Sequence, residues 1–203
     1  MARYTGPRAR MVRRLEFPVF ESPKFSNLRK NYAPGQHGQS RRTKLSNYGI
    51  QLREKQRIKY LYGVLEKQFR NYFFAADKKK GITGENLLQK LELRMDNVIY
   101  RMGLASSRST ARQLVGHGHF TVNGKKMNIP SYALEQGDTI ALNPNKIKKI
   151  PVKSAIENIK EKTLPDWLSF DTDSKQGIIQ ALPTREHVAM PIEEQLIVEL
   201  YSR

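Results

Sequence analysis

The residues of this 203-residue chain best suited to chemistry are cations gathered in residues 105–129, ASSRSTARQLVGHGHFTVNGKKMNI. Arginine and lysine side chains can reach a phosphate backbone, and imidazole and amide groups beside them can hydrogen-bond base edges and ribose hydroxyls. The segment therefore predicts a surface that meets phosphates. Its candidate contacts surround an Asn-Gly turn and are Arg108, Arg112, Gln113, His117, His119, Asn123, Lys125 and Lys126.

The charge of the whole chain favours the same kind of partner. Lysine and arginine number 36 against 19 acidic residues, which gives a net charge of +17. Residues 1–60 hold 15 basic and 3 acidic residues, residues 61–150 hold 15 and 7, and residues 151–203 hold 6 and 9. Solubility alone needs much less charge, and carboxylates serve it better. We therefore expect a polyanion to bind the first three quarters of the chain.

Composition also excludes several classes of protein. With no cysteine, the chain has no disulfide, no thiolate nucleophile and no cysteine-based zinc site, which fits a reducing cytoplasm. Apolar runs such as residues 196–198 are far shorter than a bilayer span, and no apolar block follows the basic start. We expect a soluble cytoplasmic protein with no membrane partner and no cofactor.

Motifs for catalysis and metal binding are incomplete. Residues 116–121, GHGHFT, imitate a dinucleotide fingerprint but have threonine in place of the third glycine and follow a predicted helix. The chain has neither a GxxxxGK[ST] phosphate loop nor a GxSxG-like nucleophile turn. His117 and His119 could bind a metal together, but no further ligand lies nearby in sequence. We therefore predict no enzyme and no metal site.

Hydrophobic periodicity predicts an α+β fold that begins with an arm. Residues 1–44 have few apolar residues in a regular period and are expected to be an arm or loop segment. From Ser46 a helical pattern begins, with apolar residues every four positions from Leu61 to Phe73, and Gly63 is expected to break it into two helices. A helix over residues 84–102 follows, closed by Gly103 in a left-handed conformation.

A short helix and a hairpin then complete the basic segment. Ser107 is a good N-cap, and the helix is expected to end at Gly116 or Gly118, with Arg108 and Arg112 one turn apart on its outward face. Strand, Asn-Gly turn and strand follow over residues 119–129. Further strands are predicted at residues 139–142, 167–170 and 177–182, and helices at residues 152–162 and 192–203.

More polar and aromatic residues lie among cations earlier in the chain. This mixture is typical of RNA-binding surfaces, where phosphate contacts give affinity and amide, imidazole and aromatic groups discriminate. It adds to the predicted RNA-binding residues Arg3, Tyr4, Arg13, Arg14, Gln36, His37, Arg41, Arg42, Tyr48, Gln51, Arg53, Lys55, Gln56 and Arg57.

Several blocks of the sequence resemble a known family. LELRMDNVIYRMGLASSRSTARQLVGHGHFTVNGKKMNIPSYALEQGDTIAL is similar to the RNA-binding module named after the small-ribosomal-subunit protein S-four. MARYTGP, YAPGQHGQ, LSNYGIQLREKQRIKYLYGVLEKQFRNY, GITGENLLQKLELRMDNVIYRMG and EEQLIVELYSR resemble the bacterial S-four family itself, in the same order along the chain.

The resemblance implies a fold and a division into domains. It implies a basic N-terminal arm over residues 1–44, and a helical domain over residues 45–92 completed by a closing helix at residues 191–203. It also implies an inserted RNA-binding module over residues 93–190, with its core at 93–155, built from helices packed on a small antiparallel β-sheet.

The family's function is also implied. We expect a structural constituent of the small ribosomal subunit that binds small-subunit ribosomal RNA, nucleates assembly of the subunit body, and contributes to translational accuracy. Expected partners are ribosomal protein S-five, other small-subunit proteins and messenger RNA at the channel through which it enters; repression of its own operon is a further possibility. The resemblance assigns module contacts to Arg94, Arg108, Arg112, Gln113, His117 and Asn123, and first-domain contacts to Gln51, Arg53, Lys55, Gln56 and Arg57.

One departure from the family concerns zinc. Zinc-bearing relatives hold four cysteines near the start, and their positions correspond by spacing to Ala9, Val12, Phe20 and Phe25. The chain is thus the cysteine-free form, and apolar contacts from Phe20 and Phe25 are expected to tie down the arm instead of a metal.

Two other functions remain as alternatives. An RNA-modifying enzyme such as a pseudouridine synthase can carry this module as an accessory, but it needs a large catalytic domain, and only about 50 residues follow the module here. A nucleoid-type DNA binder would rely on phosphate attraction alone, and equal affinity for duplex DNA and structured RNA would favour it.

Overall fold

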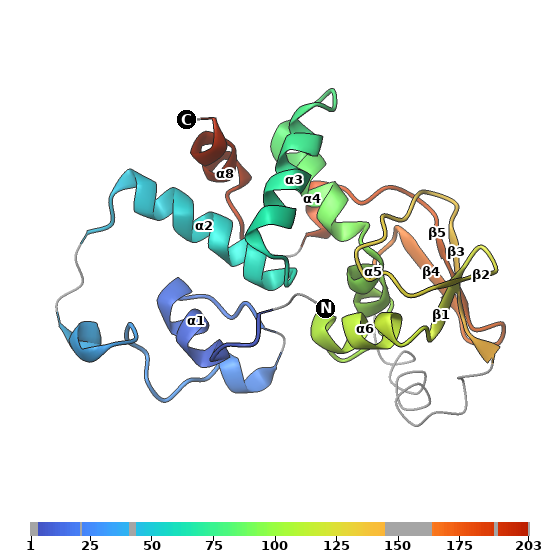
Figure 1. Cartoon of the computed structure of the whole chain (residues 1–203), viewed down its shortest axis with the longest axis horizontal. Coiled ribbons are helices and arrows are strands. Elements are labelled where there is room, and N and C mark those ends of the chain that lie inside the picture. Colours follow the sequence, from blue (N-terminus) through green and yellow to red (C-terminus); the bar gives the residue numbers. More distant parts are fainter. Residues whose placement is uncertain (1–3, 21, 41–43, 145–163, 189–190, 203) are drawn as a thin grey trace. The chain divides into compact units, whose positions relative to one another are not determined.

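The chain forms two compact units. The computed structural model describes residues 4–20, 22–40, 44–144, 164–188 and 191–202 (Figure 1). Unit 1 comprises residues 1–87 and 190–203, and unit 2 comprises residues 88–189. The helix predicted at residues 152–162 and the candidate contacts Arg3, Arg41 and Arg42 lie outside the described residues.

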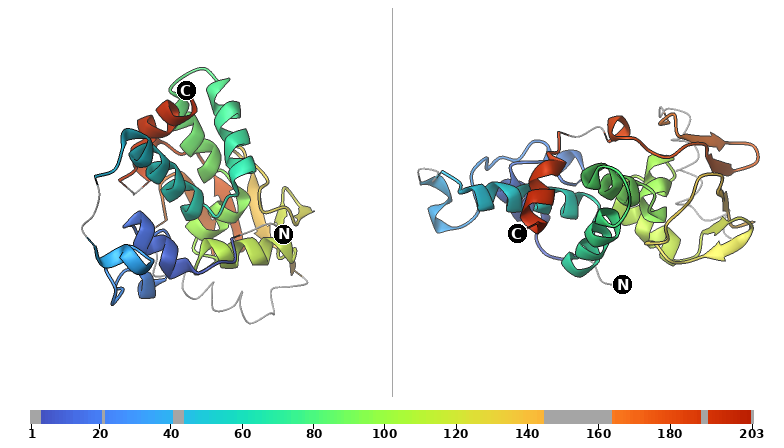
Figure 2. Two further views of the ribbon diagram at one scale, coloured as in Figure 1. Left: turned by 60° about the vertical axis from the view of Figure 1, so that its left-hand side comes forward. Right: turned by 90° about the horizontal axis from the view of Figure 1, so that it is seen from above.

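Unit 1 is helical. Ser46 caps its longest helix by accepting a hydrogen bond from Gly49 N at 3.2 Å, and Gly63, with φ 61°, separates that helix from the next as predicted. In this unit α8 packs against α2 (Figures 1 and 2). The elements are α1 (Arg8–Leu15), η1 (Pro23–Phe25), η2 (Gln36–Gln39), α2 (Asn47–Leu61), α3 (Glu66–Asp77) and α8 (Glu194–Tyr201), and α4 (Thr83–Glu92) begins in it.

The expectation of an arm without packed helix is wrong for residues 8–15. This segment is α1, and its Val12 and Leu15 are buried with Val19 in a small apolar cluster. Phe20 and Phe25 pack against the cluster, and their ring centroids are 5.6 Å apart. Two inward residues are too few to reveal a helix by periodicity. The cluster that stabilises α1 is completed by residues outside the helix, which lie in residues 17–28 and at Tyr60.

Unit 2 is a helix pair on a sheet. Its helices are α5 (Met95–Arg101) and α6 (Arg108–Gly116), with the 3₁₀-helix η4 (Arg185–His187). The sheet is antiparallel with strand order β2-β1-β3-β5-β4. The strands are β1 (Phe120–Val122), β2 (Lys125–Met127), β3 (Thr139–Leu142), β4 (Leu168–Asp171) and β5 (Gln176–Ile179). An α+β fold was predicted, and it is confirmed.

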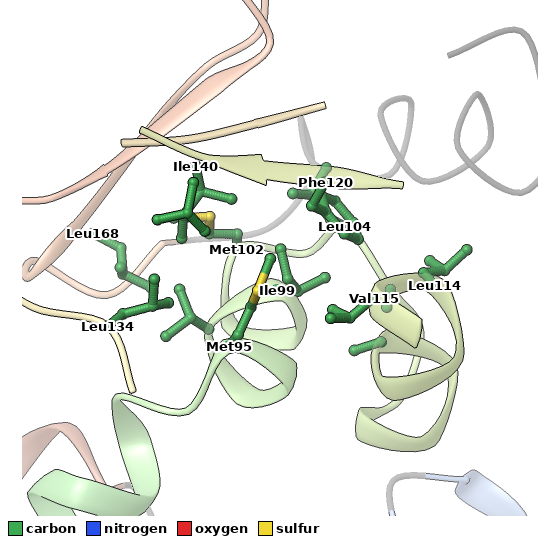
Figure 3. Packing of buried hydrophobic residues seen from close by; sticks show 14 of the residues in the cluster. Met95, Ile99, Met102, Leu104, Leu114, Val115, Phe120, Leu134, Ile140 and Leu168 are labelled. Carbon is green, nitrogen blue, oxygen red and sulfur yellow. The ribbon is translucent and has the colours of Figure 1, made fainter. Parts of the chain in front are cut away.

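The core of unit 2 lies between the helix pair and one face of the sheet. Figure 3 shows Met95 and Ile99 of α5, with Met102 directly after it, pointing toward the strand residues Phe120 and Ile140. Trp167, the single tryptophan of the chain, is 2% exposed in the same core. Burial of this continuous apolar cluster is the main force that holds α5 and α6 on the sheet.

The single helix predicted over residues 84–102 is wrong, because the chain breaks at Arg94. Arg94 has extended backbone angles, φ −68° and ψ 137°, and bridges to Ala133. Met95 N donates to Tyr132 O at 2.9 Å, and Leu134 N donates to Leu93 O at 2.9 Å. Backbone partners from residues 130–134 thus replace the helical hydrogen bonds at this point.

Candidate nucleic-acid interface

The exposed face of α6 is polar rather than cationic. Ser107 caps the helix by accepting from Thr110 N at 3.2 Å, as its sequence position predicted. Ser109, Gln113 and His117 follow at intervals of four residues and are all exposed. Of the predicted α6 contacts, Gln113 and His117 are therefore accessible to a ligand.

The prediction that Arg108 points outward is wrong. Its exposed fraction is 7%, its Nε donates to Asn97 Oδ1 at 2.8 Å, and its guanidinium lies over the Tyr100 ring at 4.6 Å from the centroid. Arg112 is half-buried, so the two arginines do not form an exposed ridge. Arg108 precedes Ala111 by three residues and Val115 by seven, which places it on the inward face.

Behind α6, a buried carboxylate holds two predicted contacts. Asp96 Oδ1 accepts from Arg94 Nε at 3.0 Å, and Asp96 Oδ2 accepts from Arg94 Nη2 at 2.7 Å and Arg112 Nη1 at 3.0 Å. Arg94 is 1% exposed, so it cannot contact a ligand in this conformation, whereas the Arg112 side chain keeps 17% of its surface. Asp96 therefore fixes the Arg112 side chain, while the Asp96 carboxylate itself is buried.

A second buried carboxylate orders the neighbouring side chains. Glu92 Oε1 and Oε2 accept from Arg101 Nη2 at 2.7 Å and Arg101 Nε at 3.0 Å, a bidentate pair. Glu92 Oε2 also accepts from Asn97 Nδ2 at 2.6 Å, and Asn97 Oδ1 in turn holds Arg108. We call the whole set the arginine network: Glu92, Arg94, Asp96, Asn97, Arg101, Arg108 and Arg112.

Sequence reasoning did not identify Glu92, Asp96, Asn97 or Arg101. The available signal was the pair of acids in a segment otherwise rich in arginine, because a buried cation needs a partner carboxylate. The network sums to two positive charges, and Arg101 and Arg112 are its most exposed arginines, with 19% and 17% of their side-chain surface accessible. These two ends are oriented by the acids behind them.

The predicted Asn-Gly hairpin is confirmed, with Asn123 at φ 50° and Gly124 at φ 77°. Asn123 Nδ2 donates to Asp138 Oδ1 at 2.8 Å, and Asn123 Oδ1 accepts from Thr139 N at 2.9 Å, so its side chain ties the turn to the start of β3. Lys125 and Lys126 are exposed on β2. The hairpin thus presents two lysines at one edge of the sheet.

His119 differs from the expectation of a surface residue, since it is 5% exposed. Gly118, with φ 68°, turns the chain between α6 and β1, and His119 N donates to Leu114 O while His119 O accepts from Asn143 N. These bonds draw His119 inward. The His117 and His119 rings have centroids 6.4 Å apart, and no group of three potential metal ligands occurs among the residues that the structure describes.

In unit 1, two predicted contacts on α2 are held by acids. Gln51 Nε2 donates to Glu199 Oε2 of α8 at 2.8 Å, and Lys55 Nζ donates to Glu66 Oε1 of α3 at 2.6 Å. Gln51 is 4% exposed and Lys55 8%. Both residues link helices, and neither presents its polar group to solvent as the sequence analysis expected.

Glu66 is the centre of a small hydrogen-bonded cluster. Besides Lys55, it accepts from Lys59 Nζ at 3.0 Å and Tyr201 OH at 3.1 Å. Burial opposes ionisation of Glu66, but the bonds from Lys55 and Lys59 outweigh it and hold the pKa of the carboxyl below its usual value. Burial, with the charge of Glu66, raises the pKa of Tyr201 far above its usual range, so the phenol stays a donor.

Two arginines of α2 are also engaged within unit 1. Arg53 pairs with Glu16 at 3.1 Å, while Arg57 pairs with Glu54 and donates to Leu15 O from Nε at 3.2 Å and Nη2 at 3.1 Å. Burial raises the pKa of Glu54, although Arg57 opposes that shift. Arg57 therefore links α2 to the end of α1.

The remaining predicted contacts of unit 1 are more accessible. Arg13 is half-buried, donates to Tyr32 O at 2.8 Å and Ala33 O at 3.1 Å, and lies over the Tyr32 ring. It therefore fastens α1 to the loop before η2. The other described contacts are exposed or half-buried: Tyr4, Arg14, Gln36, His37, Tyr48 and Gln56.

Two known protein families match this chain, one in each part of its sequence. Residues 3–92 match the model of the ribosomal protein S4/S9 N-terminal domain, and residues 93–140 match the S4 domain. The helical unit and the helix pair on a small sheet thus define a protein of the ribosomal S4 class.

Similar proteins from bacteria identify the particular family within this class. The chain is 52% identical to the small ribosomal subunit protein uS4 of Geobacter metallireducens, 53% to that of Pelobacter propionicus and 51% to that of Geobacter sulfurreducens, each over the whole of both chains. The protein belongs to the uS4 family of small-ribosomal-subunit proteins, which confirms the resemblance to the S-four family. Within the described residues, no helix is both long and apolar enough to cross a membrane.

Proposed function

We propose that this protein is a structural constituent of the small ribosomal subunit that binds small-subunit ribosomal RNA in the cytoplasm. The observation that carries the proposal is the joining of an S4 domain to a net charge of +17, concentrated in the part of the chain that precedes residue 151. Such an excess attracts any polynucleotide, so selectivity must come from side chains held in fixed positions.

Two kinds of residue are available for this task on unit 2. Lys125 and Lys126 supply exposed charge, and Gln113 and His117 supply groups that can hydrogen-bond bases or 2′-hydroxyls. The ends of Arg101 and Arg112, oriented by the arginine network, add guanidinium groups that match phosphate geometry. Arg94 and Arg108 support this surface from behind.

Binding of the complete small-subunit RNA and of duplex DNA over a range of salt concentrations tests the proposal. Affinity should be higher for the RNA, and replacing both Lys125→Ala and Lys126→Ala should flatten the log-log salt dependence by about 1.4 to 1.8, or 0.7 to 0.9 for each lost phosphate contact. Lys24→Ala with Lys30→Ala removes the same charge from other exposed positions. Equal affinity for DNA, or an equal effect of both pairs, would instead indicate bulk attraction.

The finer roles are part of the same proposal. Rigid binding at a multi-helix RNA junction would let the protein nucleate assembly of the subunit body, and contact with ribosomal protein S-five would connect it to translational accuracy. Exposed cations could also contact messenger RNA where it enters, and binding to its own message would repress its operon. Depletion of the protein should then leave particles that lack the subunit body; normal particles would refute the assembly role.

A further inference from the structure

The solvent face of α3 is rich in cations, and none of its residues is among the predicted RNA contacts. Lys67, Arg70, Asn71, Phe74 and Lys78, which we call the α3 face, follow at intervals of three, four, seven and eleven residues from Lys67 and are all exposed. Those intervals place them along one side of a helix and its C-cap. The opposite side, with Phe69, Phe73 and Ala76, is buried.

An aromatic side chain stands in the middle of this cationic face. Phe74 is 41% exposed, although a solvated helix face needs no phenylalanine, and the Arg70 guanidinium lies over its ring at 5.4 Å from the centroid. Phe74 also makes an edge contact with Phe73 at 5.9 Å, which fixes its ring against the unit 1 core. One exposed phenylalanine alone would mean little, but an anchored ring among cations is suited to stacking.

The acids on α3 do not neutralise this face. Glu66 is engaged by Lys55, Lys59 and Tyr201, as described above, and Asp77 accepts from Thr83 Oγ1 at 3.3 Å. By helical periodicity both acids lie at the edge of the face, with Asp77 about 60 degrees and Glu66 about 80 degrees from Phe74. The centre of the face therefore carries positive charge, one amide and one ring.

The loop after α3 extends the positive charge. Lys79 and Lys80 are exposed, and their carbonyl oxygens each accept from Asn86 Nδ2 at 3.3 Å. These bonds fix the loop backbone directly after α3. The two lysines therefore add to the positive electrostatic potential at the C-terminal end of the α3 face.

We infer that the α3 face is a further RNA-binding surface, which takes a phosphate backbone on its lysines and an unpaired base on the Phe74 ring. The inference deepens the proposed function and rests on it. An unpaired base fits better than a duplex because a duplex keeps its bases stacked, whereas an unstacked base can lie on an exposed aromatic ring beside an amide such as Asn71. Charge complementarity calls for an anionic occupant, and the Phe74 ring favours RNA over an acidic protein, for which leucine would serve as well as phenylalanine.

Two sets of variants of the full chain separate charge from stacking. Lys67→Ala with Lys78→Ala removes two charges without altering the Arg70–Phe74 contact, and should flatten the salt dependence of binding to the small-subunit RNA by about 1.4 to 1.8. Phe74→Leu should weaken binding about 5- to 150-fold with the salt dependence unchanged, since it removes one stacking partner and no charge. Phe74→Tyr keeps the ring and should bind as the parent does.

The outcomes distinguish this inference from the proposed function. If the parent prefers small-subunit RNA but Phe74→Leu binds as tightly, or the two lysine changes act no more strongly than Lys24→Ala with Lys30→Ala, the α3 face is not an RNA surface. If the parent shows no preference for the RNA, the proposed function fails and this inference with it. Unfolding followed by far-UV circular dichroism should be the same for the lysine variants and for Phe74→Tyr, because these lysines are exposed and tyrosine keeps the ring. A parent-like far-UV spectrum of Phe74→Leu at the temperature of the binding assay shows that its weaker binding is not unfolding.

Discussion

Asp96→Asn should unfold unit 2 at much lower denaturant concentration. The substitution removes the carboxylate charge that Arg94 contacts at 2.7 and 3.0 Å, and the Arg94 side chain that loses this partner is 1% exposed. Breaking a buried pair in this way costs about 3 to 5 kcal/mol. In a unit of residues 88–189, such a loss lowers Tm by roughly 12 °C or more.

The assay can report on unit 2 alone. Trp167 is the single tryptophan and lies in the unit 2 core, so its fluorescence during urea unfolding follows this unit. Asp171→Asn is the matched control, because Asp171 belongs to the same unit but is exposed at the end of β4. The carboxylate of Asp171 is solvated, so its replacement should change stability little. If Asp96→Asn were no worse than this control, the buried network would contribute little to stability.

Three further outcomes are expected. Phe20→Ser with Phe25→Ser should expose the chain near α1 to protease, because these rings pack on the cluster around Val12; unchanged cleavage of the free protein would contradict the metal-free arm. Gly124→Ala should destabilise unit 2 by about 1 to 2 kcal/mol, judged by Trp167 fluorescence, since φ is 77° there and the site is otherwise open; an unchanged midpoint would show that the hairpin relaxes. Because the pKa of Glu66 is lowered in the folded state, its carboxylate stabilises unit 1 above the usual pKa of 4.5, and this stability is lost as pH falls through the lower folded value. Glu66→Gln should therefore reduce the loss of stability at acid pH, measured by far-UV circular dichroism. An identical loss of stability in the variant and the parent would refute this role.

Local signals predicted the elements with strong caps and turns. Ser46 and Ser107 cap the predicted helices, and the Asn-Gly turn forms the predicted hairpin, because each signal acts within a few residues. The break at Arg94 could not be read in this way. The apolar stripe continues through it from Leu91 to Met95, and the competing hydrogen bonds come from residues 130–134.

The candidate contacts show what sequence could and could not give. The burial of Arg108 could have been predicted from the sequence, because its spacing from Ala111 and Val115 already assigned it to the inward face of α6. The burial of Lys55 could not have been predicted, since the carboxylate of Glu66 that holds it comes from another helix. Charge shows which residue types attract phosphate, but only the fold shows which of them already have an acid partner.

This division between paired and exposed cations explains how a strongly basic chain can hold a defined surface. In the described residues, Arg94, Arg108 and Lys55 are buried against acidic or amide groups, and such pairs cost desolvation that attraction must offset. These buried pairs hold the side chains of the interface in fixed positions. Because Asp96 holds Arg94 and Arg112 together, the Arg112 guanidinium is already oriented before a phosphate arrives, and less side-chain entropy is lost on binding. Exposed lysines such as Lys67 and Lys125 contribute attraction without such orientation, so variants of the two groups should differ: loss of a carboxylate behind an arginine should lower selectivity for RNA over DNA, whereas loss of an exposed lysine should weaken both similarly.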